Sequence, residues 1–110
     1  MAKVFIPNLP KRNDKRPAMD VTAAMQYGDL ITLHDLGNAK DADALDAAIA
    51  GIKYRIQDEM GVGDYLLCVG DVVLLAAAIN FACMENGSVN LLRWKGSERG
   101  YEVTNICLDV

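Results

Sequence analysis

Histidine is scarce in this chain, which has His34 as its only imidazole among 110 residues. The pair His34-Asp35 is typical of metal-dependent phosphohydrolases, but such a site needs further imidazole ligands that the chain does not contain. We therefore expect no metal site and no bound cofactor. His34 is expected to have a structural role.

Nucleotide-binding and nucleophile motifs are also missing. No G-x-x-x-x-G-K-[ST] motif occurs, and GVGDYL (61–66) precedes a strand and lacks the third glycine of a dinucleotide fingerprint. A catalytic Cys–His pair would need Cys68 beside His34. Cys68 lies in an apolar segment, where its pKa is expected to rise rather than fall. The sequence therefore gives no support to an enzyme.

Cysteines and long apolar runs are few. Cys68, Cys83 and Cys107 lie in apolar segments without metal-ligand spacing, so we expect buried free thiols in a reducing compartment. The longest apolar run, 72–78, is far shorter than the roughly 18 residues that a membrane helix needs. The first residues, MAKVFIPNLPKRNDK, lack the apolar core of a signal peptide. These features predict a cytoplasmic protein without a membrane partner.

The overall composition is that of one globular domain. A hydrophobic fraction of 52% is enough for a packed core, and the length fits a single domain over residues 1–110. The net charge of −4 is too acidic for a general nucleic-acid coat and too weak for a DNA mimic.

Hydrophobic periodicity predicts an α/β domain with the order β-α-β-α-β-α-β-β. Alternation of strands and helices favours right-handed crossovers and a mostly parallel sheet in two or three layers, with a last, antiparallel strand at an edge. The expected segments are strands over 3–7, 29–37 and 64–70, helices over 21–28, 41–61 and 72–86, and a β-hairpin over 88–110.

Capping residues mark the ends of the predicted helices. Asp20 and Gly28 bracket the first helix, Asp41 or Asp43 begins the second, and Gly61 ends it. The second helix has an apolar stripe at spacings of three and four residues, formed by Leu45, Ile49, Ile52, Ile56 and Met60.

The third helix, 72–86, begins after Asp71, ends at Gly87 and is apolar on nearly every side. Such a helix must be covered all round. A sheet covers one side, and the other side needs either the neighbouring helices or a second subunit. We therefore expect a homodimer or higher oligomer.

Charge and aromatic pairing fixes a register for the hairpin. If Lys95 faces Gly100, Arg93 faces Glu102 and Trp94 faces Tyr101, which cross-strand pairing favours. Registers two residues away remain open. Trp94 and Tyr101 would then form an aromatic patch, which either stiffens the hairpin or binds a protein partner.

The carboxyl ends of the strands are the predicted place for a ligand. Asn8 lies at one strand end, and the basic loop at 11–16 leaves the sheet from the same edge. A phosphate could bind between this loop and a helix N-terminus. The alternative is that Asp71 only caps its helix and that the loop is solvated. The candidate ligand-binding residues are Lys11, Arg12, Lys15, Arg16, His34, Asp35, Gly70 and Asp71.

The segment DYLLCVGDVVLLAAAINFACMENGSVNLLRWKGSERGYEV (64–103) resembles small proteins encoded by bacteriophages and related mobile elements. The resemblance rests on Asp64-Tyr65-Leu66-Leu67, Gly70, the alanine-rich helix, and the Leu92-Arg93-Trp94 hairpin with Tyr101. It implies a phage accessory protein made in the bacterial cytoplasm. Small phage proteins of this kind often bind a host protein or a host signalling molecule. The resemblance assigns no activity to any residue.

Three functional hypotheses follow. The first is a non-enzymatic, phage-type accessory protein that acts as a small oligomeric binding module. The second is a binder of a nucleotide or phosphate ligand, or a minimal phosphoryl-transfer enzyme, at the strand ends near His34, Asp35 and Gly70. The third is nucleic-acid binding through the basic loop at 11–16, which no aromatic residue interleaves.

The basic loop gives a first testable prediction. Arg12 and Arg16 are better phosphate ligands than the two lysines, because a guanidinium binds phosphate through two hydrogen bonds. Replacing both arginines by alanine is expected to leave folding intact. It should weaken binding of a phosphate ligand or nucleic acid by about 1–3 kcal/mol per lost contact and lower its salt dependence. Calorimetric titration with nucleotides, cyclic nucleotides and short oligonucleotides measures both, and the absence of heat with all of them would refute a phosphate site.

Overall fold

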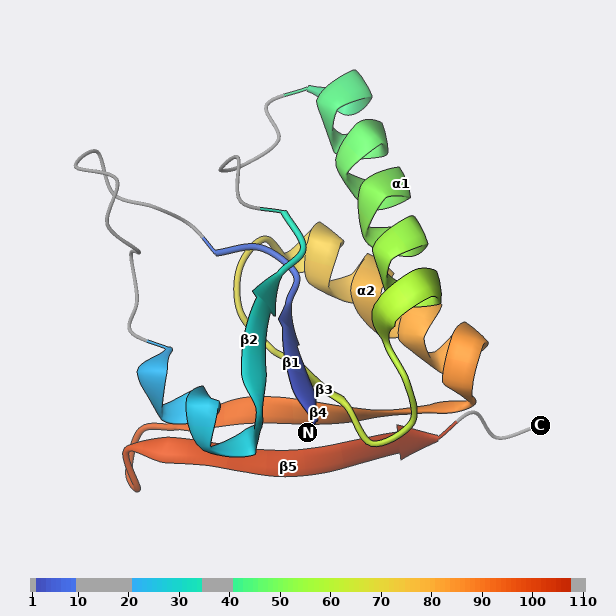
Figure 1. Ribbon diagram of the computed structural model, residues 1–110. Coiled ribbons are helices and arrows are strands. Elements are labelled where there is room, and N and C mark those ends of the chain that lie inside the picture. The colour runs from blue at the N-terminus through green and yellow to red at the C-terminus, as the bar shows by residue number, and fades with distance from the viewer. Residues whose placement is uncertain (1, 10–20, 35–40, 108–110) are drawn as a thin grey trace.

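The computed structural model describes residues 2–9, 21–34 and 41–107 (Figure 1). These residues form a mixed α/β fold around a five-stranded sheet with the order β2-β1-β3-β4-β5. The strands are β1 (Lys3–Ile6), β2 (Asp29–Thr32), β3 (Tyr65–Leu67), β4 (Ser88–Lys95) and β5 (Gly100–Cys107), and the helices are η1 (Thr22–Tyr27), α1 (Ala42–Glu59) and α2 (Val72–Asn86).

The sheet is parallel except at one edge, as predicted. β1 pairs in parallel with both β2 and β3, and β3 pairs in parallel with β4. β5 pairs antiparallel with β4 and lies at the edge of the sheet. The predicted hairpin register is confirmed, since Arg93 faces Glu102, Trp94 faces Tyr101 and Lys95 faces Gly100.

The two faces of the sheet are covered unequally. The longer helices α1 and α2 share one face, and they enclose a core that includes Phe5, Ile52, Ile56 and Leu74 (Figure 1). The short helix η1 lies on the opposite face, over a smaller cluster centred on Ala24. The fold therefore has three layers, one of them only a single short helix.

Local sequence explains why α1 forms. The Asp41 side chain accepts a hydrogen bond from the backbone N–H of Ala44, as an N-cap does. The apolar stripe faces the core, with Ile52 and Ile56 fully buried. The last helical residue is Glu59 and Met60 follows as the extended C-cap, so the helix ends two residues before the expected position of Gly61.

Helix α2 has the predicted ends. The Asp71 carboxylate accepts hydrogen bonds from the backbone N–H groups of Val73 and Leu74, and Gly87 closes the helix at a φ of 77°. A positive φ at this position suits glycine, which has no β-carbon to clash. Neither α2 nor any other helix in the described ranges is long and apolar enough to span a membrane.

Other segment boundaries also differ from the prediction. The strand expected over 29–37 ends at Thr32, and residues 35–37 lie outside the described residues. The strand expected over 64–70 pairs only over Tyr65–Leu67, because the chain bends as it leaves the sheet toward Gly70. The first helix is a 3₁₀ helix with Val21 rather than Asp20 at its N-cap position.

Gly70 gives a stability prediction. Its φ is 93°, and a β-carbon there would lie 2.1 Å from the backbone oxygen of Asn8. Gly70→Ala should therefore destabilise the protein by at least about 1–3 kcal/mol, the cost of a strained backbone conformation alone. Gly51→Ala in α1 is the matched control, since nothing lies within 4 Å of the added carbon. It should stabilise by up to about 1 kcal/mol. Urea denaturation measures both, and equal midpoints for the two variants would contradict the prediction.

Candidate functional site

The carboxyl edge of the sheet is organised by Asn8, whose side chain is fully buried. Its Nδ2 donates to the backbone oxygen of His34 at 3.3 Å, and its Oδ1 accepts from the backbone N–H of Asp71 at 3.1 Å. One amide therefore joins the ends of β1, β2 and β3. The structure brings His34, Gly70 and Asp71 together with Asn8, as the parallel topology predicted.

The contacts at this edge are structural. The Asp71 carboxylate binds the first turn of α2, which places a negative charge where an anion would otherwise bind. The Asn8 side-chain amide accepts one hydrogen bond and donates one, and both link it to backbone groups of other segments. The candidates Lys11, Arg12, Lys15, Arg16 and Asp35 lie outside the described residues. The phosphate site therefore stays a prediction.

The three cysteines differ in burial. Burial raises the pKa of the Cys68 thiol, although the nearby Arg93 charge partly opposes the shift. A thiol with a raised pKa is a poor nucleophile at neutral pH. All three cysteines are free, and Cys83 is buried as expected. Cys107 is exposed, so the expectation of a buried thiol is wrong there, because β5 has a neighbouring strand on one side only.

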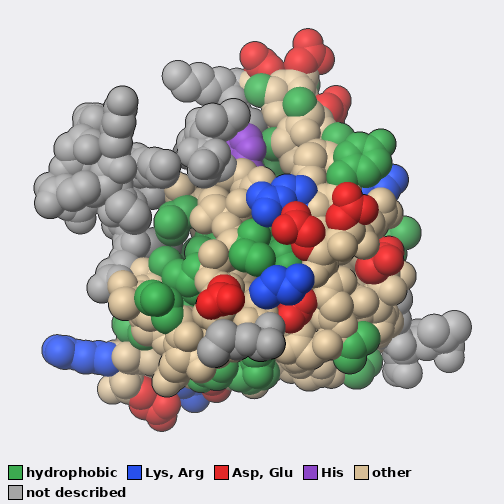
Figure 2. Space-filling model, in the orientation of Figure 1, with side chains coloured by type: hydrophobic (Ala, Val, Ile, Leu, Met, Phe, Trp, Pro, Cys, Tyr) green, Lys and Arg blue, Asp and Glu red, His purple; other side chains and the backbone are tan. Residues whose placement is uncertain are grey.

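Residues 2–9, 21–34 and 41–107 contain no cluster of three or more His, Cys, Asp or Glu side chains that could hold a metal ion. On the face formed by α1 and β2, acidic and basic side chains are intermingled (Figure 2). One such pair is Arg55 and Glu59, 2.8 Å apart on α1, and the hydrogen bond from Arg55 lowers the pKa of Glu59. The described residues therefore form no continuous basic surface for nucleic acid on this face.

The amino edge of the sheet is organised by Asp64, a residue that contributes to the sequence resemblance but has no role predicted from the sequence. Its carboxylate accepts from the backbone N–H of Lys3 at 3.0 Å and from that of Gly61 at 2.9 Å. The Asn90 side chain donates to the Asp64 backbone oxygen at 3.4 Å. Asp64 thus joins the start of β1, the turn after α1 and strand β4. A glycine-flanked turn followed by an aspartate just before a strand was the available signal.

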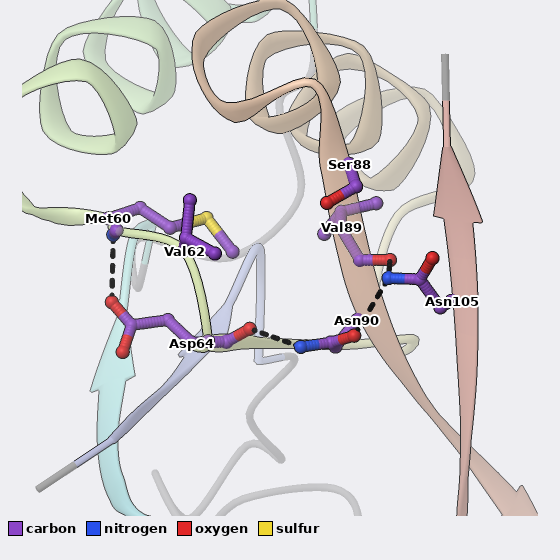
Figure 3. Close-up of a pocket in the computed structure, with 9 residues that line it drawn as sticks. Met60, Val62, Asp64, Ser88, Val89, Asn90 and Asn105 are labelled. Carbon is purple, nitrogen blue, oxygen red and sulfur yellow. Dashed lines mark hydrogen bonds between the residues drawn. The ribbon is translucent and has the colours of Figure 1, made fainter. Parts of the chain in front are cut away.

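Beside Asp64 lies a hollow of about 180 Å³ between the α1–β3 turn and strands β4 and β5 (Figure 3). Met60 and Val62 stand on one side, and Asn105 on the other, with Asn90 reaching across toward Asp64. The Asn105 side chain donates to Asn90 Oδ1 at 2.9 Å and to the Val89 backbone oxygen at 3.4 Å. The described residues that line the hollow are Met60, Gly61, Val62, Gly63, Asp64, Ser88, Val89, Asn90 and Asn105.

The hairpin carries the predicted aromatic pair. The rings of Trp94 and Tyr101 are 5.2 Å apart at an interplanar angle of 68°, an edge-to-face contact. Trp94 remains 51% exposed, so half of it is available to a partner. On the opposite face of the hairpin, Glu102 is 3.0 Å from both Arg93 and Lys95. The hydrogen bond from Lys95 is the largest cause of a lowered pKa at Glu102.

The aromatic pair predicts a stability effect. Trp94→Ala should lower the free energy of unfolding by about 0.5–1.5 kcal/mol, because it removes an edge-to-face contact. Tyr54→Ala is the control, since Tyr54 is 65% exposed on α1 and a surface substitution of this kind usually changes stability by less than about 0.5 kcal/mol. Thermal unfolding followed by circular dichroism measures the difference. An unchanged melting temperature for Trp94→Ala would show that the pair does not stabilise the hairpin.

Comparison with known proteins identifies a family for this chain. Neither a curated protein nor a solved structure matches the chain. The profile of one family, described as Phage Pam3 gp32-like protein, matches residues 2–108, which is nearly the whole chain. This match supports the phage origin that the sequence resemblance implied. The α/β domain with its buried Asn8 and Asp64 contacts therefore belongs to the Phage Pam3 gp32-like protein family.

Proposed function

We propose that this protein is a phage accessory protein that acts in the host cell as a homodimeric binding module rather than as an enzyme. The observation that carries the proposal is an uncovered apolar strip on α2. The α2 strip consists of Val73, Ala76, Asn80 and Met84. All four are exposed, with Val73 at 45% and Met84 at 69%, while the opposite side of α2 is buried.

The occupant that fits the α2 strip is a second copy of the same helix. The residues recur at spacings of three and four, as in a helix–helix seam, and none of them is charged. In an antiparallel pair centred on Asn80, the small Ala76 of one copy faces the long Met84 of the other. Asn80 then meets its own symmetry mate, and a side-chain amide is both donor and acceptor, so it pairs with itself.

The expected affinity is modest. Full burial of a valine or methionine contributes about 1.5–3 kcal/mol. The side chains of the α2 strip are already partly covered in one chain, so only a fraction of that free energy is gained on pairing. Association itself costs about 4 kcal/mol or more. A dimer that forms at micromolar concentration is the expected result.

The hairpin supplies the partner surface of this module. Trp94, Tyr101 and Val103 lie on one face of the hairpin, because residues paired across strands share a face. Val103 is 46% exposed beside the half-exposed Trp94. Aromatic residues are enriched where proteins bind one another. The partner proposed for this surface is a host protein, and dimerisation would present the surface twice.

The competing functions have less support. A nucleotide or phosphate binder, or a minimal phosphoryl-transfer enzyme, would use the carboxyl edge, where the polar groups of Asn8 and Asp71 already bind the backbone. Nucleic-acid binding would depend on Lys11, Arg12, Lys15 and Arg16, which lie outside the described residues. The binding module depends instead on side chains that are exposed in the described chain, among them Val73, Met84 and Trp94.

Dimerisation is tested by placing a charge on the α2 strip. Met84→Glu should convert a dimer into a monomer at micromolar concentration, because two carboxylates would be buried at the interface without partners. Met25→Glu is the matched control, since Met25 is 60% exposed on η1 and lies away from α2. Light scattering after size exclusion measures the mass, and circular dichroism checks the fold. A monomeric wild-type protein, or a dimer that survives Met84→Glu, would refute the α2 interface.

A further inference from the structure

The hollow beside Asp64 has the composition of a small-ligand site rather than of a packing defect. Met60, Val62 and Val89 give it apolar surface, while Ser88, Asn90 and Asn105 give it hydrogen-bonding groups (Figure 3). We propose that this hollow binds a free nucleobase or nucleoside, a flat neutral ring with a hydrogen-bonding edge. This site is separate from the α2 strip and from the hairpin patch.

Size limits the ligand to something small. Pockets for drug-sized ligands and cofactors usually measure about 300–1,000 Å³. The hollow holds about 180 Å³, so it is too small for a dinucleotide and large enough for one ring system. Its walls favour a ring, because the apolar side chains of Met60 and Val62 can cover a flat face while the asparagines contact the edge.

Hydrogen-bonding capacity remains at the polar wall. Asn105 Nδ2 is engaged by the Val89 backbone oxygen and by Asn90 Oδ1, which fixes the orientation of both amides. Among the described residues, the Cys107 thiol is the donor to Asn105 Oδ1, and a thiol is a weak donor that a ring N–H would outcompete. The Ser88 hydroxyl has no hydrogen-bond partner in the described part of the chain. A base edge with both donors and acceptors matches this set.

Charge argues for the neutral ring and against its phosphate. Asp64 is the only charged side chain in the lining. Both α1 and α2 end at this edge of the sheet, and the C-terminal end of a helix carries a partial negative charge. The Lys3 ammonium already binds the Glu59 backbone oxygen at the end of α1. A phosphate group would therefore meet negative potential here.

Nuclear magnetic resonance titration of the full chain tests the proposal. The probes are the free nucleobases, the common ribonucleosides and the 5′-monophosphates of these nucleosides. At least one nucleoside should shift the backbone amide signals of Val62, Gly63, Asn90 and Asn105 in a saturable manner, with a Kd on the order of 1 mM for so small a ligand. Its monophosphate should bind roughly fivefold more weakly, the effect of one like charge at close range in water.

Matched variants make the result specific. Val62→Trp should abolish the shifts by filling the hollow, and it should fold normally because Val62 is 81% exposed. Met25→Trp on η1 is the matched control, because Met25 is 60% exposed and does not line the hollow, and it should bind like the wild type. Met84→Glu should also bind normally, so a failure of dimerisation and a failure of ligand binding are distinguishable. Absence of saturable shifts with every probe, or unchanged binding by Val62→Trp, would overturn the proposal.

Discussion

The buried amide of Asn8 is the interaction on which the carboxyl half of the fold depends. Burial of an amide is unfavourable unless its polar atoms find partners, and Asn8 finds them in the backbones that follow β2 and β3. The same arrangement requires Gly70, because the backbone of Asn8 occupies the space where a β-carbon would lie. Asn8 and Gly70 together fix where α2 leaves the sheet, and so they set the direction in which the α2 strip faces.

Asp64 has the corresponding task at the amino edge, but its surroundings differ. Its carboxylate holds the start of β1 and the turn after α1, and Asn90 and Asn105 continue the hydrogen bonding across β4 and β5. At the carboxyl edge the side chains of Asn8 and Asp71 form hydrogen bonds with backbone groups. At the amino edge a chain of side-chain amides borders an open hollow. Within residues 2–9, 21–34 and 41–107, the amino edge therefore has side-chain polar groups beside a hollow, whereas those of Asn8 and Asp71 at the carboxyl edge bind the backbone.

Features set by local sequence could be predicted, and features set by distant contacts could not. The caps at Asp41, Asp71 and Gly87 and the register of the hairpin depend on residues close in the chain, and all of them are confirmed. Asn8 bonds to residues 26 and 63 positions away, and Asp64 to one 61 positions away, so no local pattern reveals these contacts. The short length of β3 could not be predicted from local sequence either, because the length of a buried strand depends on where its neighbouring strands end. The hollow lies between segments that only the fold brings together.

For α2, composition predicts that the helix is buried but does not predict which of its sides remains exposed. Its uniformly apolar sequence predicts that every side needs cover, but it does not say which side the fold leaves open. The α1 helix and strand β4 cover the side of Leu74, Ala78 and Ala82, and the open side carries two small or polar residues between Val73 and Met84. Ala76 and Asn80 reduce the exposed apolar area of the α2 strip, so that it is not a large hydrophobic patch that would aggregate. In water the Asn80 amide is hydrated at little cost, whereas in a twofold pair it would specify one alignment. A strip of this kind suits reversible and specific self-association better than permanent burial.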